Sequence, residues 1–378
     1  MWLIKKIKKK EVKIKIKLIK IKTWIIKKRY ILKNSNHSKK IIIFFFPTDT
    51  DAISGGVLSI CSILKEVKKL DKIHNCNVYS SFLPDVAGKS YTYSKFESDL
   101  ILFDFKQISH QFRELDYLEL QIPDIFVSMF SKENIHFQSF FKWIENVKEI
   151  KINILNQNDM LMPDLKCINE IKKITSNITM TVAHEKYATL ERRKYYDIAL
   201  HLFSPWTSPT PYIFKKFNEK ENIIVLSPDT IDNNLYPTLY TKENIINKLK
   251  IELPQFEIIT IENMAYEDYK KLISTAKFAI TFGEGLDGYF CEPIFSGCVS
   301  FAVYNEIFFT PQFKNLPTVY DNFEILFDKI VDDIKSLNTL NKFSVYNESQ
   351  KLMISKIYSL DRLKKNIKEY YLGNIDFK

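Results

Sequence analysis

"FAITFGEGLDGYFCEPIFSGCVSFAVY", residues Phe278–Tyr304, holds four of the eight glycines in a chain of 378 residues. Its two apolar ends predict buried strands, and the part between them predicts a loop and the start of a helix. Average usage would give roughly 26 glycines, so those retained are expected to meet backbone requirements. A strand, a glycine loop and a helix start also present free N–H groups and a positive dipole end, which suit a phosphate.

A second glycine pair, Gly55 and Gly56, stands in an equivalent place near the start of the chain. The apolar run "KKIIIFFFP" (Lys39–Pro47) predicts a strand buried on both faces, and helical spacing of apolar residues follows from Val57 to Leu70. Strand, Ser-Gly-Gly turn and helix are how an open α/β domain begins. The two glycine loops are therefore expected at the C-terminal edges of two parallel sheets that face each other across a cleft.

The rest of the chain alternates strand and helix patterns, which predicts two α/β domains. The acidic stretch "RELDYLELQIPD" (113–124) is interpreted as a solvated helix face, and "FSPWTSPTPY" (Phe203–Tyr212) as the domain boundary. Further strands are expected at 76–82, 99–105, 150–155, 178–183, 222–228 and 256–261, and helices at 242–253, 266–276 and about 349–371. The predicted parts are a basic arm (1–38), an N-terminal domain (39–208), a C-terminal domain (209–345) and a C-terminal helix that packs back on the first domain (346–378).

The net charge of +10 is distributed unevenly. The first 40 residues hold fifteen lysines, one arginine and one acidic residue, so the remainder carries a net −5. Lysines alternate with Ile and Leu in this arm, which predicts contact of residues 1–33 with an anionic membrane surface. The competing interpretation is a lysine-rich, poorly ordered leader. No apolar run is long enough to span a bilayer, and the five cysteines show no paired spacing, so a cytoplasmic, membrane-peripheral protein is expected.

Glu284 and Glu292 flank the glycine loop, and the segment that begins with them resembles a family motif. Glu284, seven residues, Glu292 and then "PIFSGCVSFAV" is similar to the EX7E donor segment of GT-B glycosyltransferases. The resemblance covers about Lys40 to Tyr371, with its specific part at Phe278–Tyr304. It implies two Rossmann-like α/β/α domains with parallel sheets and a C-terminal helix that crosses back to the first domain.

The resemblance also implies site residues. Glu292 is expected to hold the donor ribose, as acidic residues do in nucleotide sites, and Glu284 to lie near the donor sugar and the leaving phosphate. His184, after the strand at 178–183, matches a histidine that lines the cleft, so the implied catalytic residues are Glu284 and His184. The implied donor-binding residues are Gly283, Gly285, Leu286, Asp287, Gly288, Tyr289 and Glu292, and the implied acceptor or phosphate loop is Gly55 and Gly56.

The sequence departs from the family in one respect. These enzymes usually carry an Arg or Lys pair just after the first strand of the second domain, but "VLSPDTIDNN" (Val225–Asn234) has no basic residue. Neutralisation of the diphosphate is a main catalytic lever when a nucleoside diphosphate leaves. Arg192, Arg193 and Lys277 are the candidate substitutes.

The function expected from these features is transfer of a sugar from a nucleotide-sugar donor to a bacterial cell-surface glycan or lipid-linked glycan, such as capsule or lipopolysaccharide. No metal, no cofactor and no nucleic-acid partner are expected, and retention of configuration is implied by the resemblance alone. The first alternative is a non-catalytic GT-B-like subunit that binds a sugar or a partner. The second is a metal site of the GT-A type at Asp49–Asp51, which otherwise forms a solvated turn.

Overall fold

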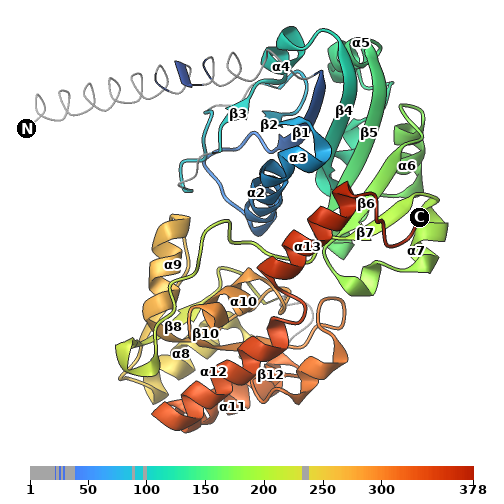
Figure 1. The fold of residues 1–378 in the computed structure, drawn as a ribbon. Coiled ribbons are helices and arrows are strands. Elements are labelled where there is room, and N and C mark those ends of the chain that lie inside the picture. Colours follow the sequence, from blue (N-terminus) through green and yellow to red (C-terminus); the bar gives the residue numbers. More distant parts are fainter. Residues whose placement is uncertain are drawn as a thin grey trace, which may run out of the picture. The chain divides into compact units, whose positions relative to one another are not determined.

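The computed structural model describes Lys22, Ile25, Ile26, Arg29 and residues 39–86, 90–96, 100–231 and 238–378. Most of the predicted basic arm, and with it the membrane contact of residues 1–33, lies outside the described residues. The chain separates into a first unit, Met1–Ser204 with Leu363–Lys378, and a second unit, Pro205–Arg362. Figure 1 shows the strands and helices of each unit.

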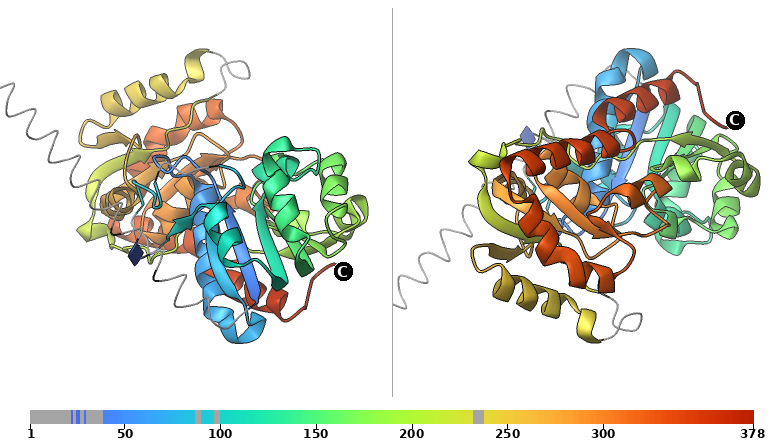
Figure 2. Two further views of the ribbon diagram at one scale, coloured as in Figure 1. Left: turned by 90° about the horizontal axis from the view of Figure 1, so that it is seen from above. Right: turned by 90° about the horizontal axis from the view of Figure 1, so that it is seen from below.

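The first unit is built on a parallel sheet of seven strands, counted over the described residues, in the order β3-β2-β1-β4-β5-β6-β7. Helices cover both faces, as the two views in Figure 2 show. The strands are β1 (Lys40–Phe46), β2 (Asn77–Phe82), β3 (Leu102–Phe103), β4 (Leu115–Pro123), β5 (Val147–Asn156), β6 (Ile178–Val182) and β7 (Ala199–Leu202). The helices are α2 (Gly55–Val67), α3 (Asp71–His74), α4 (Phe105–Gln111), α5 (Gln138–Ile144), α6 (Leu165–Lys172), α7 (Leu190–Tyr196) and α13 (Leu360–Tyr371).

The interpretation of the acidic stretch 113–124 as a helix face is wrong. The stretch forms the central strand β4, which lies between β1 and β5. Its residues alternate between two buried faces. Leu118, Leu120 and Ile122 join the main apolar core with residues of α4, α5 and α6. Glu119 and Gln121 point to the other face and are 1% and 0% exposed. The alternation of apolar and polar residues from Leu118 to Ile122 is itself the period of a strand, and the helix interpretation overlooked it.

That second face of the first sheet carries a row of buried polar side chains, which we call the polar row. It consists of Glu119, Gln121, Asn153, Thr179 and Thr181. Gln121 accepts a hydrogen bond from Asn153 (2.7 Å), and Thr179 donates to Asn153 (2.8 Å). The hydroxyls of two C-terminal tyrosines complete it: Tyr370 lies 3.0 Å from the Thr179 hydroxyl, and Tyr370 and Tyr371 donate to Glu119 at 3.3 and 3.2 Å. Helix α13 therefore docks on this sheet through hydrogen bonds as well as apolar contacts.

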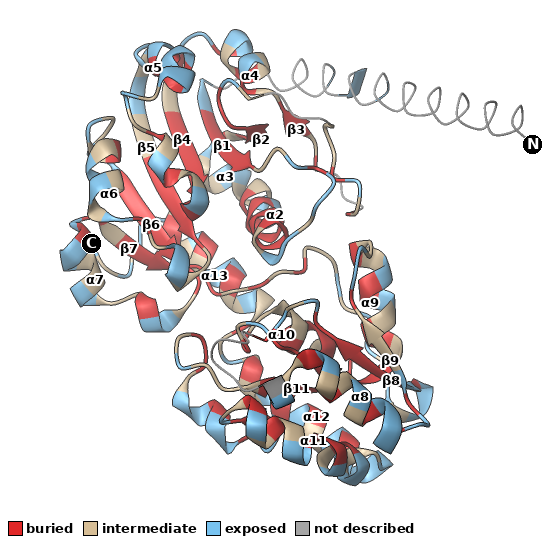
Figure 3. Cartoon of the chain, turned by 180° about the vertical axis from the view of Figure 1, so that it is seen from behind, coloured by how far each residue is buried: buried red, intermediate tan, exposed pale blue. Residues whose placement is uncertain are grey.

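The second unit has a parallel sheet of five strands over the described residues, in the order β12-β11-β10-β8-β9. Its apolar core is formed by residues that include Ile224, Leu226, Phe278, Ile280, Val299 and Phe301, and Figure 3 shows buried residues along the strands of both units. The strands are β8 (Glu221–Leu226), β9 (Glu257–Thr260), β10 (Ala276–Ile280), β11 (Val299–Val303) and β12 (Val319–Tyr320). The helices are α8 (Lys242–Glu252), α9 (Tyr266–Thr275), α10 (Gly288–Phe295), α11 (Phe323–Leu337) and α12 (Leu340–Ile354).

The C-terminal segment differs from the sequence-based boundary at 346. Helix α12 belongs to the second unit, where Asn347 donates to the carbonyls of Ile294 and Cys298 and Gln350 pairs with Ser300. Only the chain from Leu363 onward joins the first unit. Because residues 349–371 share one helical pattern, the break between α12 and α13 has no signal in the hydrophobic period.

Candidate functional site

The glycine loop joins β10 to α10 in the second unit. Asp287 caps the helix: its Oδ1 accepts from the Phe290 amide (2.9 Å), and its Oδ2 accepts from the Thr281 hydroxyl (2.9 Å). Burial is the main cause that raises the pKa of the Asp287 carboxyl to about 7, and the neighbouring carboxylates of Asp229 and Glu284 contribute to this rise. The loop therefore combines a capped helix start with a concentration of acidic groups.

Packing inside the second unit accounts for the glycines of this loop. A Cβ at Gly283 would lie 2.8 Å from Oδ2 of Asp229, and one at Gly288 would lie 2.9 Å from Oε1 of Glu292. Gly285 has φ +89°, which other residues rarely adopt, and a Cβ there would lie 2.7 Å from the carbonyl oxygen of Val303. The expectation of a backbone requirement is confirmed for Gly285, whereas the atoms nearest to Gly283 and Gly288 are carboxylate oxygens at the ends of side chains.

Glu292 lies on α10 and is only 3% exposed. Its Oε1 accepts from the Thr207 hydroxyl (2.7 Å), and its Oε2 accepts from the Tyr266 hydroxyl (3.0 Å). Burial raises the pKa of the Glu292 carboxyl to about 7, while these two hydroxyls and the ammonium of Lys270 oppose the rise. The side chain predicted to hold a ribose thus forms hydrogen bonds with two protein hydroxyls, on partners that lie 85 and 26 residues away in the sequence.

The other predicted donor residues lie along the same loop and helix start. Gly283 is exposed, Glu284 is half-buried and Leu286 is buried. Tyr289 is half-buried and meets the Tyr269 ring edge-on, with centroids 5.9 Å apart, and burial raises the pKa of Tyr289 to about 12. The exposed Gly283 thus stands next to Glu284, whose carboxylate is partly accessible.

Lys242 is a cation at this edge that the sequence reasoning missed. Its Nζ donates to the carbonyls of Ser227 (2.6 Å) and Asp229 (2.9 Å), directly after β8. Burial lowers the pKa of this ammonium, and the carboxylates of Asp229 and Glu262 oppose that change. A signal was available: Lys242 follows the N-cap Thr241, and a cation in the first turn of a helix is unfavourable with its dipole.

Lys277, a proposed substitute for the missing basic pair, lies at the wrong end of the sheet. It stands near the start of β10, whereas the glycine loop follows the end of that strand, and its ammonium donates to Asn222 (2.8 Å) and Asn338 (3.2 Å). A parallel strand of five residues spans roughly 16 Å, so Lys277 cannot reach a ligand at the glycine loop.

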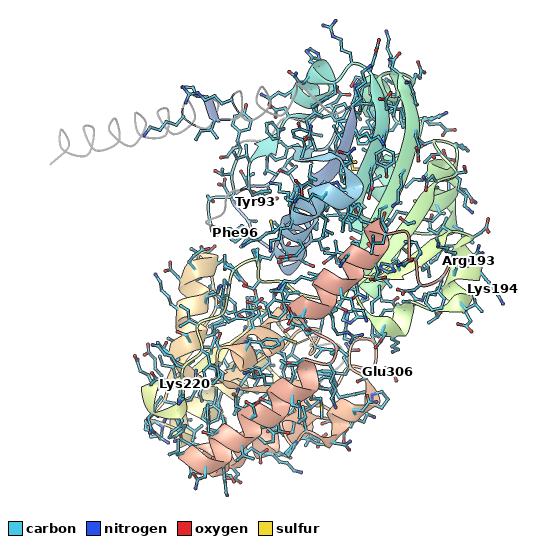
Figure 4. All side chains as sticks on the ribbon, in the orientation of Figure 1. Tyr93, Phe96, Arg193, Lys194, Lys220 and Glu306 are labelled. Carbon is cyan, nitrogen blue, oxygen red and sulfur yellow. The ribbon has the colours of Figure 1, made fainter. Side chains whose placement is uncertain are left out.

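The predicted residues of the first unit are spread over its sheet. His184 follows β6 and lies edge-on to Tyr187, and burial lowers its pKa to about 4, so its imidazole is neutral at pH 7. Arg192 pairs with Asp159 and stacks on Tyr187. Arg193, labelled on α7 in Figure 4, donates to the carbonyl oxygen of Lys378 (2.9 Å). Both arginines thus already have partners within the first unit.

Gly55 and Gly56 open helix α2, with Ser54 as the N-cap that accepts from the Val57 amide (3.3 Å). A Cβ at Gly55 would meet nothing within 4 Å, and one at Gly56 only the Ser54 hydroxyl at 3.8 Å. Neither glycine is required by packing. Strands β4 and β5 separate β1 from β6, so this loop and His184 start about 14 Å apart along the sheet edge.

The Asp49–Asp51 turn is exposed at both carboxylates, and Asp49 accepts from the Asp51 amide at 3.1 Å. Nearby, the Ser94 amide donates to the Thr50 carbonyl (2.9 Å), and the same loop carries Tyr93, labelled in Figure 4. Within the part of the chain that the structure describes, no group of three or more His, Cys, Asp or Glu side chains is placed to hold a metal ion. None of the described helices is both long and apolar enough to cross a membrane.

Comparison with known proteins gives a likeness of fold. No protein-family model and no curated protein matches the chain. An alpha-glucosyltransferase solved in complex with UDP-glucose and abasic-site DNA matches with a TM-score of 0.56 and 10% identity, over 88% of this chain and 99% of that chain. HepE of Anabaena, solved with UDP and glucose, matches with a TM-score of 0.49 and 9% identity, over 90% of this chain and 100% of that chain.

The architecture predicted from the sequence is confirmed. Each unit is an α/β layer structure on a parallel sheet, and the C-terminal helix α13 belongs to the first unit although it follows the second in the chain. The match with the glucosyltransferase covers 88% of this chain and almost the whole of that chain. The chain therefore has the GT-B fold.

Proposed function

We propose that the protein is a glycosyltransferase that takes a sugar from a nucleotide-sugar donor. The observation that carries the proposal is the glycine loop at the C-terminal edge of β10, where open α/β folds bind their ligands. The fold supports it, because a structure with the same fold was solved with UDP-glucose. The acceptor is a glycan or lipid-linked glycan of the cell surface, and the enzyme works without a metal and with retention of configuration.

Two residues at this edge suit a donor. Lys242 supplies a cation, and its contacts with Ser227 and Asp229 use two of its three N–H donors. The half-buried Glu284 stands in the loop itself, where a carboxylate can orient sugar hydroxyls. In the first unit, the neutral imidazole of His184 can accept or donate a hydrogen bond to the transferred sugar, and the unobstructed Gly55–Gly56 turn admits close approach of an acceptor or phosphate.

One observation favours the alternative of a non-catalytic GT-B-like binding subunit. Asp229 and Glu284 lie close enough to Asp287 to raise its pKa, so the loop is acidic, and an anionic diphosphate is repelled by carboxylates. Glu292 is enclosed by protein hydroxyls, so it is not presented to a ribose in this conformation. A subunit that binds a sugar or a protein partner needs neither a loop that accepts a diphosphate nor a carboxylate that is accessible to a ribose.

The test is calorimetric binding of UDP, GDP, ADP and CMP, each with EDTA and with Mn²⁺, followed by an assay for donor hydrolysis and transfer. Lys242→Met should weaken binding of the preferred diphosphate at least tenfold, about 1.4 kcal/mol, because it removes the cation at the loop edge. Lys277→Met is the matched control, since it removes a lysine from the opposite end of the same sheet, and its affinity should stay within about twofold of the wild type.

The outcomes separate the two functions. Binding with turnover of the donor supports the transferase, and binding without turnover supports the subunit. If the folded protein binds none of the four nucleotides with or without Mn²⁺, the donor site is refuted. Strict dependence on Mn²⁺ would refute the metal-independent mechanism alone.

A further inference from the structure

Two segments of chain join the units. The chain enters the second unit at Pro205 and leaves it at Arg362. Residues 205–212 follow the first crossing and residues 355–362 precede the second, and we call these the joining segments. Both pack within the second unit on the same helix, α10, which also begins at the glycine loop.

The first set of contacts is a chain of hydrogen bonds that ends at Glu292. The Thr207 amide donates to the Tyr358 hydroxyl (2.9 Å), the Tyr358 and Thr207 hydroxyls share a hydrogen bond, and the Thr207 hydroxyl donates to Oε1 of Glu292 (2.7 Å). When Glu292 is ionised its carboxylate only accepts, and the donors then run from Tyr358 through Thr207 to Glu292. Thr207 of the first joining segment is thus hydrogen-bonded both to Tyr358 of the second and to Glu292 of α10.

The second set of contacts is a cluster of four aromatic rings around Phe295, in the last turn of α10. Phe295 stacks on Tyr212 with a centroid distance of 5.6 Å and an interplanar angle of 8°, and on Tyr358 at 6.0 Å. Trp206 meets Phe295 at 5.3 Å and Tyr358 at 5.5 Å. Such ring pairs stabilise beyond the burial of their area, so α10 holds both joining segments by apolar contacts as well.

We propose that α10 clamps the two joining segments to the glycine loop as one cooperative element, with Thr207 and Tyr358 as its positioning residues. Glu292 then acts inside this clamp rather than as a surface ligand. A ligand that orders the glycine loop also orders both joining segments, because the loop runs directly into the short helix that carries the carboxylate of Glu292 and the ring of Phe295.

The proposal predicts an effect of each joining segment on the other. Thr207→Val keeps the shape of the side chain but removes its hydroxyl, so Tyr358 and Glu292 lose a shared partner. The amides of 355–362 should then exchange with solvent deuterium faster, roughly fivefold for a lost hydrogen bond of about 1 kcal/mol. Tyr358→Phe should do the same to 205–212, and Phe295→Leu should speed exchange in both.

The experiment is amide hydrogen exchange of the full chain, read by mass spectrometry for peptides within 205–212 and 355–362. Phe256→Leu is the matched control: it shortens a buried ring of the same unit that packs on Phe278, away from α10. Exchange in β8 reports any general loss of stability. The clamp is refuted if Thr207→Val changes only its own segment, or if Phe256→Leu changes the joining segments as much as Phe295→Leu does.

A second arm rests on the proposed function. Saturating UDP should slow exchange in the glycine loop and in both joining segments of the wild type, and in Tyr358→Phe only in the loop. If UDP protects the loop but neither joining segment, the coupling is wrong although the donor site stands. If UDP does not bind, the proposed function fails, and the clamp is decided by the ligand-free comparison alone.

Discussion

Replacing Gly285 by alanine should destabilise the second unit strongly. The new Cβ would stand 2.5 Å from the Phe309 ring and 2.7 Å from the Val303 carbonyl oxygen, at a φ of +89°. The left-handed backbone costs an alanine about 1–2 kcal/mol, and forcing a group into a packed site costs about 1–3 kcal/mol more. The two costs add, so the free energy of unfolding should fall by about 2–5 kcal/mol.

Gly55→Ala is the opposite case and serves as the control. It adds the same methyl group to the other glycine loop, where no atom lies within 4 Å and φ is not positive. Alanine there restricts only the unfolded chain, so the first unit should gain about 0.4–1 kcal/mol. Two chemically identical substitutions are thus expected to change stability in opposite directions.

The assay is urea unfolding followed by tryptophan fluorescence. Trp206 is buried in the second unit and Trp143 in the first. For Gly285→Ala, parent and variant carry phenylalanine at Trp2, Trp24 and Trp143, so that Trp206 alone reports. With an m-value of about 2 kcal/mol/M, the midpoint should fall by about 1–2.5 M. An unchanged midpoint would refute the argument that close packing requires glycine at position 285.

The remaining predictions concern buried carboxylates. Because burial raises the pKa values of Glu292 and Asp287 to about 7, the folded second unit binds protons more tightly than the unfolded chain; its unfolding free energy should be highest below about pH 4 and fall as the pH rises to 7. Urea unfolding of Glu292→Gln with Asp287→Asn at several pH values should show this slope removed. Glu119→Ala takes the acceptor from the polar row and should cost the first unit about 3 kcal/mol or more, whereas Glu114→Ala, at a side chain 80% exposed, should cost less than about 0.5 kcal/mol in thermal unfolding.

The sequence predicts those parts of the fold whose signal is local. Apolar runs give β1 and β10, and the predicted helices at 242–253 and 266–276 agree with α8 and α9 to within one residue at each end. The strand β4 is the main error. The alternation from Leu118 to Ile122 is a local strand signal, but the burial of its polar face is not, because Glu119 is satisfied by Tyr371, 252 residues away in the chain.

The candidate site, like the fold, could be predicted from the sequence only in part. The glycine loop is evident from composition, and the packing at Gly285 confirms why a glycine-poor chain keeps glycine there. The environment of Glu292 is not evident, because its partners Thr207 and Tyr266 come from a linker and another helix. Lys242 shows the same limit, since it reaches the end of β8 from a helix that starts 15 residues after Ser227.

The polar row also has a consequence for the order in which the protein is made. The first unit consists of two pieces, and the whole second unit is translated before Leu363–Lys378. At about 5–20 residues per second, the sheet waits roughly ten seconds or more for α13. Amide, hydroxyl and carboxyl groups can be hydrated during that interval, whereas an apolar face would be a site for aggregation. A nascent chain arrested before Leu363 is therefore expected to expose a wettable surface, and release of the last residues completes the domain that was synthesised first.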